Sequence, residues 1–452
     1  MVEAAVVDRP WLQAVQWLGR RLSRWRFELA AVVVLATTYT RLAGAYGVWP
    51  IRLAGAGVIV VALGWPASRR LVLRRFAHAR LRRQFLAGAR RIGLVTAEDL
   101  VPFVGRVRDV PAGERLALRV PPGCTVGRIQ DAAEALAVCL RVRDVRVRRA
   151  PDDASRVWLT VVRRDPLAAS SPLPWPAAEA ARMSLWEPVP VGVDEDGQPV
   201  RVSLPERNVL FGAEQGGGKS VAQSQLVAAA ALDPEVDLYL FDGKRVELAP
   251  WAPCAVETVG PDVEVANDVL DRLVAEMDRR YERLLDHRRR KIERGDGLRL
   301  IVVVVDELAF YTAGGNDRTG KALRAGFADR LHALIARGRA AGIIVLAATQ
   351  KPAHDIVPTF LRDLFGFRWA LRCTTPDASD TILGRGWASA GYSATDVPAE
   401  ARGVGYLLAE GGLPVRLRSY HLDDDTLARI ADRAAALRTG QQRDRSGWEA
   451  AA

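Results

Sequence analysis

Residues 208–220 read Asn-Val-Leu-Phe-Gly-Ala-Glu-Gln-Gly-Gly-Gly-Lys-Ser. A short apolar run precedes three consecutive glycines, and a helix-like stretch begins at Val221. Because glycine has no Cβ, such a backbone can curl around a polyphosphate and direct N–H groups at it, and the following helix adds a positive N-terminal end. The stretch therefore predicts a strand, a phosphate-binding loop and a helix, in that order.

Read from Ala213, the spacing matches the Walker A pattern, with alanine in place of its usual first glycine. In that pattern Lys219 reaches the β- and γ-phosphates, and the Ser220 hydroxyl ligates Mg²⁺, so we expect ATP and Mg²⁺ as ligands. A surface glycine turn followed by a chance Lys-Ser pair is the alternative interpretation. The residues expected to bind the nucleotide are Ala213, Glu214, Gln215, Gly216, Gly217, Gly218, Lys219, Ser220 and Val221.

The run 300–305 is apolar throughout, as a strand covered on both faces must be, and it ends in Asp306-Glu307. This is the Walker B arrangement, in which Asp306 holds Mg²⁺ through water and Glu307 polarises the attacking water as general base. An acidic pair that only caps a helix is the alternative. Ligands of open α/β sheets bind at the carboxyl ends of strands, where both motifs are expected.

Four further polar residues are candidates for the same site. Gln350 follows the expected strand 343–348, where an amide can sense the γ-phosphate or orient water, unless it is a simple turn residue. Arg339, or alternatively Arg337, is expected to act as an arginine finger in trans, because a guanidinium suits the charge spread over a transferring phosphoryl group. For Lys244 three roles stay open: it contacts phosphate, it contacts a neighbouring subunit, or it forms a structural ion pair.

Composition limits the class of protein. The chain has 452 residues, of which 49% are apolar and 26% charged, so we expect two or three folded domains. The net charge of +11 favours an acidic partner, either nucleic acid or anionic lipid. The four cysteines lack metal-ligand spacing, which indicates reduced thiols in a cytoplasmic compartment and neither a zinc site nor a disulfide framework.

Residues 1–90 are expected to form a membrane anchor. An arginine-rich amphipathic helix precedes two apolar stretches, 29–46 and 49–65, each near the roughly 20 residues that a spanning helix needs. Arginine clusters flank this pair, so the positive-inside rule places both ends in the cytoplasm. The prediction is a multi-pass protein of the cytoplasmic membrane; a buried helical hairpin is the alternative.

The rest of the chain divides into four parts. Residues 94–166 read as a small α+β domain, and 167–185 as a linker that contains proline and serine. In 186–425 helical stretches alternate with β-branched runs, which predicts an α/β fold with a mostly parallel sheet and helices on both faces, a RecA-like P-loop NTPase. Residues 426–452 are expected to form a helix and a flexible tail. Alternating arginines in 141–149 either contact DNA phosphates or form a solvated face.

Residues 334–343 read Leu-Ile-Ala-Arg-Gly-Arg-Ala-Ala-Gly-Ile, and 346–352 read Leu-Ala-Ala-Thr-Gln-Lys-Pro. These segments resemble the motor of the FtsK/SpoIIIE DNA-translocase family, which carries Arg-Ala-Ala-Gly-Ile before Leu-Ala-Thr-Gln-Arg-Pro. The resemblance implies a homo-hexameric, membrane-anchored ATPase that pumps double-stranded DNA through its ring. It covers roughly residues 110–425, and further agreement lies at 241–248, 276–281, 305–307 and 380–384.

The chain also departs from the family's chromosome-segregating members, which usually have four membrane spans, a long linker and a C-terminal winged-helix domain. Only two candidate spans are present, and about thirty residues follow His421. This compact organisation is similar to the transfer proteins of actinobacterial plasmids and integrative elements. It implies DNA transfer between cells during conjugation, with other transfer or spread proteins as partners. The alternatives are chromosome segregation in division or sporulation, and an ATPase that drives protein secretion.

Overall fold

The computed structural model describes residues 40–41, 44–45, 47, 49, 66–150, 153–168, 171–314, 317–354 and 356–449. The chain divides into two compact units, Met1–Val104 with Pro121–Cys124, and Gly105–Val120 with Thr125–Ala452. The expected amphipathic helix and nearly all of both apolar stretches lie outside the described residues. Within the described part, no helix is both long enough and apolar enough to span a bilayer.

The first unit contains the long helix α4 (Pro66–Arg91). It ends in Arg90 and Arg91, cations that interact favourably with the negative end of the helix dipole. Gly93 follows with φ +72°, a left-handed conformation that glycine adopts without strain. Just after the helix, Leu94 N donates a hydrogen bond to Ala89 O at 2.8 Å and so closes its last turn.

The chain then forms a four-stranded sheet with the strand order β1-β2-β4-β3. The sequence predicts one helix over 127–140, whereas in the structure this segment forms two shorter helices that meet at Ala132. The strand β1 was not expected from the sequence. The elements are β1 (Phe103–Val110), β2 (Gly113–Arg119), α5 (Val126–Asp131), α6 (Ala133–Leu140), β3 (Asp144–Arg149), β4 (Arg156–Val162) and the short helix η1 (Pro166–Ala168).

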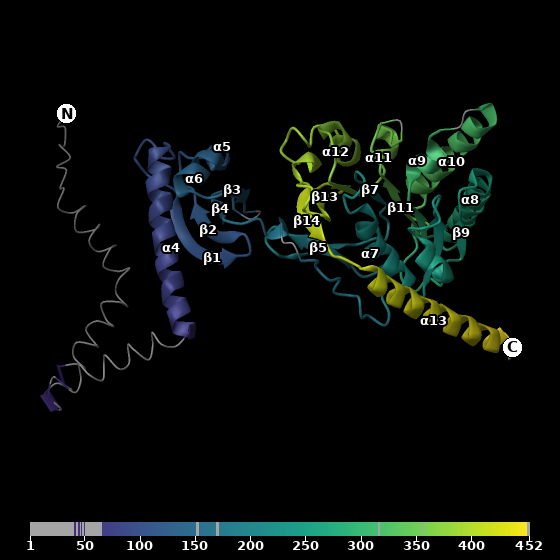
Figure 1. Ribbon diagram of the computed structural model, residues 1–452, viewed down its shortest axis with the longest axis horizontal. Coiled ribbons are helices and arrows are strands. Elements are labelled where there is room, and N and C mark those ends of the chain that lie inside the picture. The colour runs from purple at the N-terminus through teal and green to yellow at the C-terminus, as the bar shows by residue number, and fades with distance from the viewer. Residues whose placement is uncertain are drawn as a thin grey trace, which may run out of the picture. The chain divides into compact units, whose positions relative to one another are not determined.

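Ten strands of the described residues form the large sheet, in the order β6-β5-β14-β13-β12-β7-β11-β10-β8-β9 (Figure 1). The strands from β12 to β9 are parallel to one another, whereas β13, β14, β5 and β6 pair antiparallel. Their bounds are β5 (Val189–Asp194), β6 (Pro199–Val202), β7 (Val209–Gly212), β8 (Val236–Phe241), β9 (Glu257–Val259), β10 (Leu300–Val305), β11 (Ile343–Thr349), β12 (Phe367–Leu371), β13 (Val404–Ala409) and β14 (Val415–Ser419).

The sheet is therefore mixed, where the sequence predicted a mostly parallel one. Short turns cause part of the difference, because a turn of a few residues can join only antiparallel strands, whereas a parallel pair needs a long crossover. One such turn, with Gly411 at φ +75°, joins β13 to β14, and another joins β5 to β6. The parallel half, which carries both nucleotide motifs, agrees with the prediction.

Helices cover both faces of this sheet. On β10, Val302 and Val304 pack into one apolar core, while Ile301, Val303 and Val305 pack into the other. This explains why the strand is apolar at every position. The first core is covered by α7 (Lys219–Ala231), η2 (Ala249–Cys254) and α13 (Asp424–Glu449). The second is covered by α8 (Val263–Asp286), α9 (Leu308–Thr312), α10 (Arg318–Arg337), α11 (Thr359–Arg362), α12 (Pro376–Leu383) and η3 (Ala394–Asp396).

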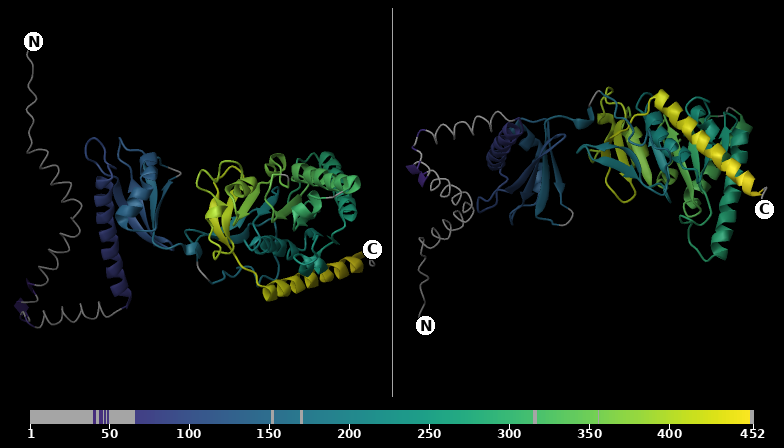
Figure 2. Two further views of the ribbon diagram at one scale, coloured as in Figure 1. Left: turned by 45° about the horizontal axis from the view of Figure 1, so that its top comes forward. Right: turned by 90° about the horizontal axis from the view of Figure 1, so that it is seen from below.

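The helix α13, drawn in yellow in Figures 1 and 2, packs against α7 and is fixed to its end. The Arg438 guanidinium donates hydrogen bonds to the carbonyls of Val236 at 2.8 Å and Ala230 at 3.1 Å, and also reaches those of Ala231 and Asp233. The last carbonyls of a helix have no partner within it, so a cation there satisfies them and suits the dipole.

Candidate functional site

The glycine-rich loop joins β7 to α7 with the backbone that the sequence predicted. Gly216 has φ +78° and Gly218 has φ +98°, both in the left-handed region. A Cβ at Gly218 would lie 2.9 Å from the backbone nitrogen of Gly403, so only glycine allows this close approach. The loop is held by neighbouring strand ends, since Ala213 N donates to Thr349 O at 3.2 Å.

Lys219 lies in the first turn of α7 and is 3% exposed. Its ammonium Nζ donates to Asp306 Oδ1 at 2.6 Å and to the Asp306 carbonyl at 2.7 Å. A buried charge is tolerated only where it is paired and hydrogen-bonded, and this pair meets that condition. The two motifs that the sequence identified separately are therefore in direct contact.

The carboxyl group of Asp306 fits a bound Mg²⁺. It is completely buried at the end of β10, and its Oδ2 has no hydrogen-bond partner among the described residues. An orphaned buried carboxylate oxygen is costly unless a cation or a water occupies its free side. Ser220, also predicted as a metal ligand, is half-buried in the loop cavity. Both residues supply oxygen atoms, which Mg²⁺ prefers.

Glu307, the predicted general base, is turned toward the end of β11. Its Oε1 accepts a hydrogen bond from Thr349 Oγ1 at 2.9 Å, and its Oε2 accepts one from Gln350 N at 2.9 Å. It also caps α9 by accepting from Ala309 N at 3.3 Å. Glu307 therefore caps α9, as in the alternative interpretation, and also contacts the end of β11. The Thr349 contact was not anticipated from the sequence.

A cavity of about 610 Å³ opens at this edge of the sheet. The predicted residues that line it are Glu214, Gln215, Gly216, Gly218, Lys219, Ser220, Val221, Lys244 and Gln350. Ala213 and Gly217 belong to the loop but are buried and do not line the cavity. Asp306 and Glu307 do not line it either. Most of the predicted residues are therefore brought together around one space, with the two acids beneath it.

The arginine candidates lie away from this cavity. Arg339 donates to the Glu206 carbonyl at 2.6 Å and to Glu410 at 3.2 Å. Arg337 pairs with Asp278. Neither contacts the loop of its own chain, so a role as a finger requires that it reach the site of a second subunit.

Glu214 has a partner that sequence reasoning missed. The Arg372 guanidinium, just after β12, lies 2.6 Å from Glu214 Oε1, and Thr374 donates to the other carboxylate oxygen. Glu214 N also donates to the Arg372 carbonyl at 2.9 Å. A carboxylate in a phosphate loop would repel its ligand, and Arg372 compensates that charge. The missed signal is the run Phe367–Leu371, which was not recognised as a strand.

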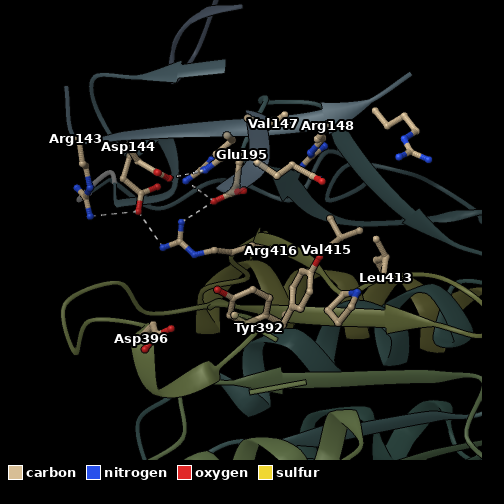
Figure 3. Close-up of a pocket in the computed structure, with 17 residues that line it drawn as sticks. Arg143, Asp144, Val147, Arg148, Glu195, Tyr392, Asp396, Leu413, Val415 and Arg416 are labelled. Atoms are coloured by element: carbon tan, nitrogen blue, oxygen red, sulfur yellow. Dashed lines mark hydrogen bonds and ion pairs between the residues drawn. The ribbon is translucent and has the colours of Figure 1, made fainter. Parts of the chain in front are cut away.

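A larger cavity of about 870 Å³ lies elsewhere and contains several of the arginines in 141–149 (Figure 3). Arg416 on β14 forms ion pairs with Asp165 and Glu195, each at 2.9 Å, and Arg146 joins Glu195 at 2.7 Å. Arg148 lies 3.7 Å from Asp196. These arginines therefore pair with acids of the same unit, an arrangement that neither prediction for 141–149 had included.

We expect this ion-pair network to make the free energy of unfolding fall as the pH is lowered into the acid range. Burial raises the pKa of Asp165, but the hydrogen bond and charge of Arg416 outweigh it, so the net pKa lies below its ordinary value of 3.8. A carboxyl group with a lowered folded pKa adds stability above its unfolded pKa, and this is lost as pH falls through the folded value. Urea unfolding between pH 6 and pH 2 should show a smaller loss for Asp165→Asn; equal losses would contradict the expectation.

Together, the strand-loop-helix with its buried Lys219–Asp306 pair and the acidic end of β10 define a P-loop NTPase domain. Residues 177–385 match the model of the FtsK/SpoIIIE family.

Two curated relatives are DNA translocases. The chain is 27% identical over 363 residues to DNA translocase FtsK of Halalkalibacterium halodurans, which covers 75% of this chain and 44% of that protein. It is 26% identical over 346 residues to DNA translocase SftA of Bacillus subtilis, which covers 72% and 34%. The chain thus spans less than half the length of these relatives.

A solved structure shares the fold. The pCW3 conjugation coupling protein TcpA, in a monomer form with ATPγS, aligns with a TM-score of 0.54 and 19% identity. The alignment covers 79% of this chain and 99% of that one.

Proposed function

We propose that this chain is an ATP-driven translocase of double-stranded DNA. The observation that carries the proposal is that the segment matching the FtsK/SpoIIIE family, 177–385, contains the phosphate loop, Lys219, Asp306 and Glu307 in contact with one another or with the same strand ends. The names of the two curated relatives support DNA as the substrate. The net charge of +11 agrees with a polyanionic partner.

Each site residue has a distinct role in this proposal. The loop N–H groups and Lys219 bind the phosphates, while Ser220 and Asp306 hold Mg²⁺. Bound Mg²⁺ supplies positive charge to the phosphate oxygens. Glu307 accepts a proton from the attacking water, and Gln350, whose backbone already contacts Glu307, positions that water.

Finer points belong to the same proposal. The chain acts as a homo-hexamer, in which Arg339 completes the site of the adjacent subunit, and residues 1–90 anchor it to the cytoplasmic membrane with the motor in the cytoplasm. Conjugative transfer of plasmid or integrative-element DNA, alongside other transfer proteins, is favoured by the shared fold of a conjugation coupling protein over nearly its whole length. Chromosome segregation is the second candidate, since both curated relatives are named DNA translocases and neither name mentions conjugation.

The test is ATP hydrolysis by the full chain in detergent or lipid nanodiscs, with and without double-stranded DNA, over a salt series. We expect stimulation by DNA that fades as salt rises, because phosphate contacts weaken with ionic strength. Glu307→Gln protein serves as the background control. If DNA leaves turnover unchanged in a protein that binds ATP and forms rings, the translocase proposal fails and protein secretion takes its place.

A further inference from the structure

The loop cavity extends well beyond the phosphate loop. At about 610 Å³ it falls in the size range of sites that hold a complete small-molecule ligand. Two segments distant in sequence contribute to its lining, the linker residues 172–173 and the residues 418–421 at the end of β14, and we call them the far wall; Glu247, Glu400, Arg402 and Gly403 line the cavity as well. None of these residues belongs to a nucleotide motif, so their place in the cavity needs its own explanation.

This far wall is fixed in place. His421 N donates to the Leu173 carbonyl at 2.6 Å, and Pro174 pairs with His421 as a parallel bridge. The buried Trp175 indole donates to the Pro190 carbonyl at 2.9 Å and anchors the linker to β5. On the other segment, Gln225 of α7 donates to the Tyr420 carbonyl at 2.9 Å. The wall is thus tied to the helix that begins at the phosphate loop.

The side chains of the wall combine apolar surface with a cation. Tyr420 is buried and Leu173 half-buried, both in contact with the same apolar core. Arg418 is half-buried, and no acid or hydrogen-bond acceptor contacts its guanidinium among the described residues. Burial lowers the pKa of Arg418, because its charged form is partly removed from water. A desolvated guanidinium without a partner suits a ligand that offers acceptors or an aromatic face.

We infer that Leu173, Arg418, Tyr420 and His421 form the subsite for the base and ribose of the nucleoside triphosphate. The inference rests on the proposed binding of phosphates at the loop. The base packs against the apolar part of the wall, and Arg418 and His421 supply polar contacts to base or ribose. Since Leu173 belongs to the linker between the small α+β domain and the ATPase domain, the nucleoside contacts the linker directly.

The experiment compares two probes on the full chain, Mg·ATP and Mg·tripolyphosphate, by calorimetry. Tripolyphosphate has the phosphates and lacks the nucleoside. In Leu173→Ala, Arg418→Gln and His421→Ala we expect the Kd for ATP to rise about tenfold, which corresponds to roughly 1.4 kcal/mol. The Kd for tripolyphosphate should stay unchanged.

The controls are matched by chemistry. Leu413→Ala and Arg429→Gln make the same changes at exposed positions that do not line the loop cavity, and should alter neither Kd. His421 is itself exposed, so its variant keeps the test valid if Leu173→Ala lowers stability. Equal weakening of both probes, or of neither, overturns the nucleoside subsite. If the unchanged protein fails to bind tripolyphosphate and ATP, the proposed ATPase function is wrong instead.

Discussion

Glu307→Gln is expected to reduce ATP hydrolysis by about 100- to 10,000-fold, the usual contribution of a general base. Glutamine has nearly the same size: its Oε1 can accept from Gln350 N while its Nε2 donates to the Thr349 hydroxyl, in place of the two contacts that Glu307 makes at 2.9 Å each. Binding of ATP should therefore change little, because Glu307 is not in the lining of the loop cavity. Single-turnover hydrolysis and calorimetric binding measure the two quantities separately.

Thr349→Val is the matched control for this prediction. It removes the hydroxyl that donates to Glu307 and leaves the carboxylate in place. We expect a partial loss of turnover, much smaller than that of Glu307→Gln, because the base is less well positioned but still present. If Glu307→Gln hydrolyses ATP at the normal rate, Glu307 is only the cap of α9, and the base lies elsewhere.

The residues that sequence reasoning located are those whose chemistry depends on local order along the chain. The strand at 300–305 is apolar at every position because both faces are covered, and Asp306 follows it directly. The three glycines precede Lys219 with the spacing that a phosphate loop needs, and Gly218 has the left-handed φ that only glycine adopts freely. Such signals are complete within ten residues or so of sequence.

The residues that were missed depend on contacts between distant segments. Arg372 neutralises Glu214 because β12 pairs with β7 in the sheet, and nothing near Glu214 in the sequence indicates that pairing. Likewise, His421 N donates a hydrogen bond to the Leu173 carbonyl, although more than half of the strands and helices of the large unit lie between these two residues in the sequence. The antiparallel half of the sheet was incompletely predicted, because β5, β6 and β14 have only six, four and five residues, and the turns beside them were not recognised.

Lys219→Ala is expected to have two effects that can be separated. The first is loss of ATP hydrolysis by about 100- to 1,000-fold, as is usual when one charge-stabilising group is removed from a preorganised site. The second is loss of stability by about 3–5 kcal/mol, because Asp306, completely buried, is left without its partner. Turnover under saturating ATP and urea unfolding at neutral pH measure these effects.

The double variant Lys219→Ala with Asp306→Asn decides whether the loss of hydrolysis is only a consequence of the loss of stability. Asparagine removes the unpaired buried charge, so most of the lost stability should return. Hydrolysis should stay at least as low as in Lys219→Ala, because the ammonium that binds phosphate oxygens is still missing and a metal ligand has been removed as well. Asp306→Asn alone provides the reference for the metal-ligand loss. If the double variant regains both stability and hydrolysis, Lys219 serves only to neutralise Asp306, and the phosphate-binding role is wrong.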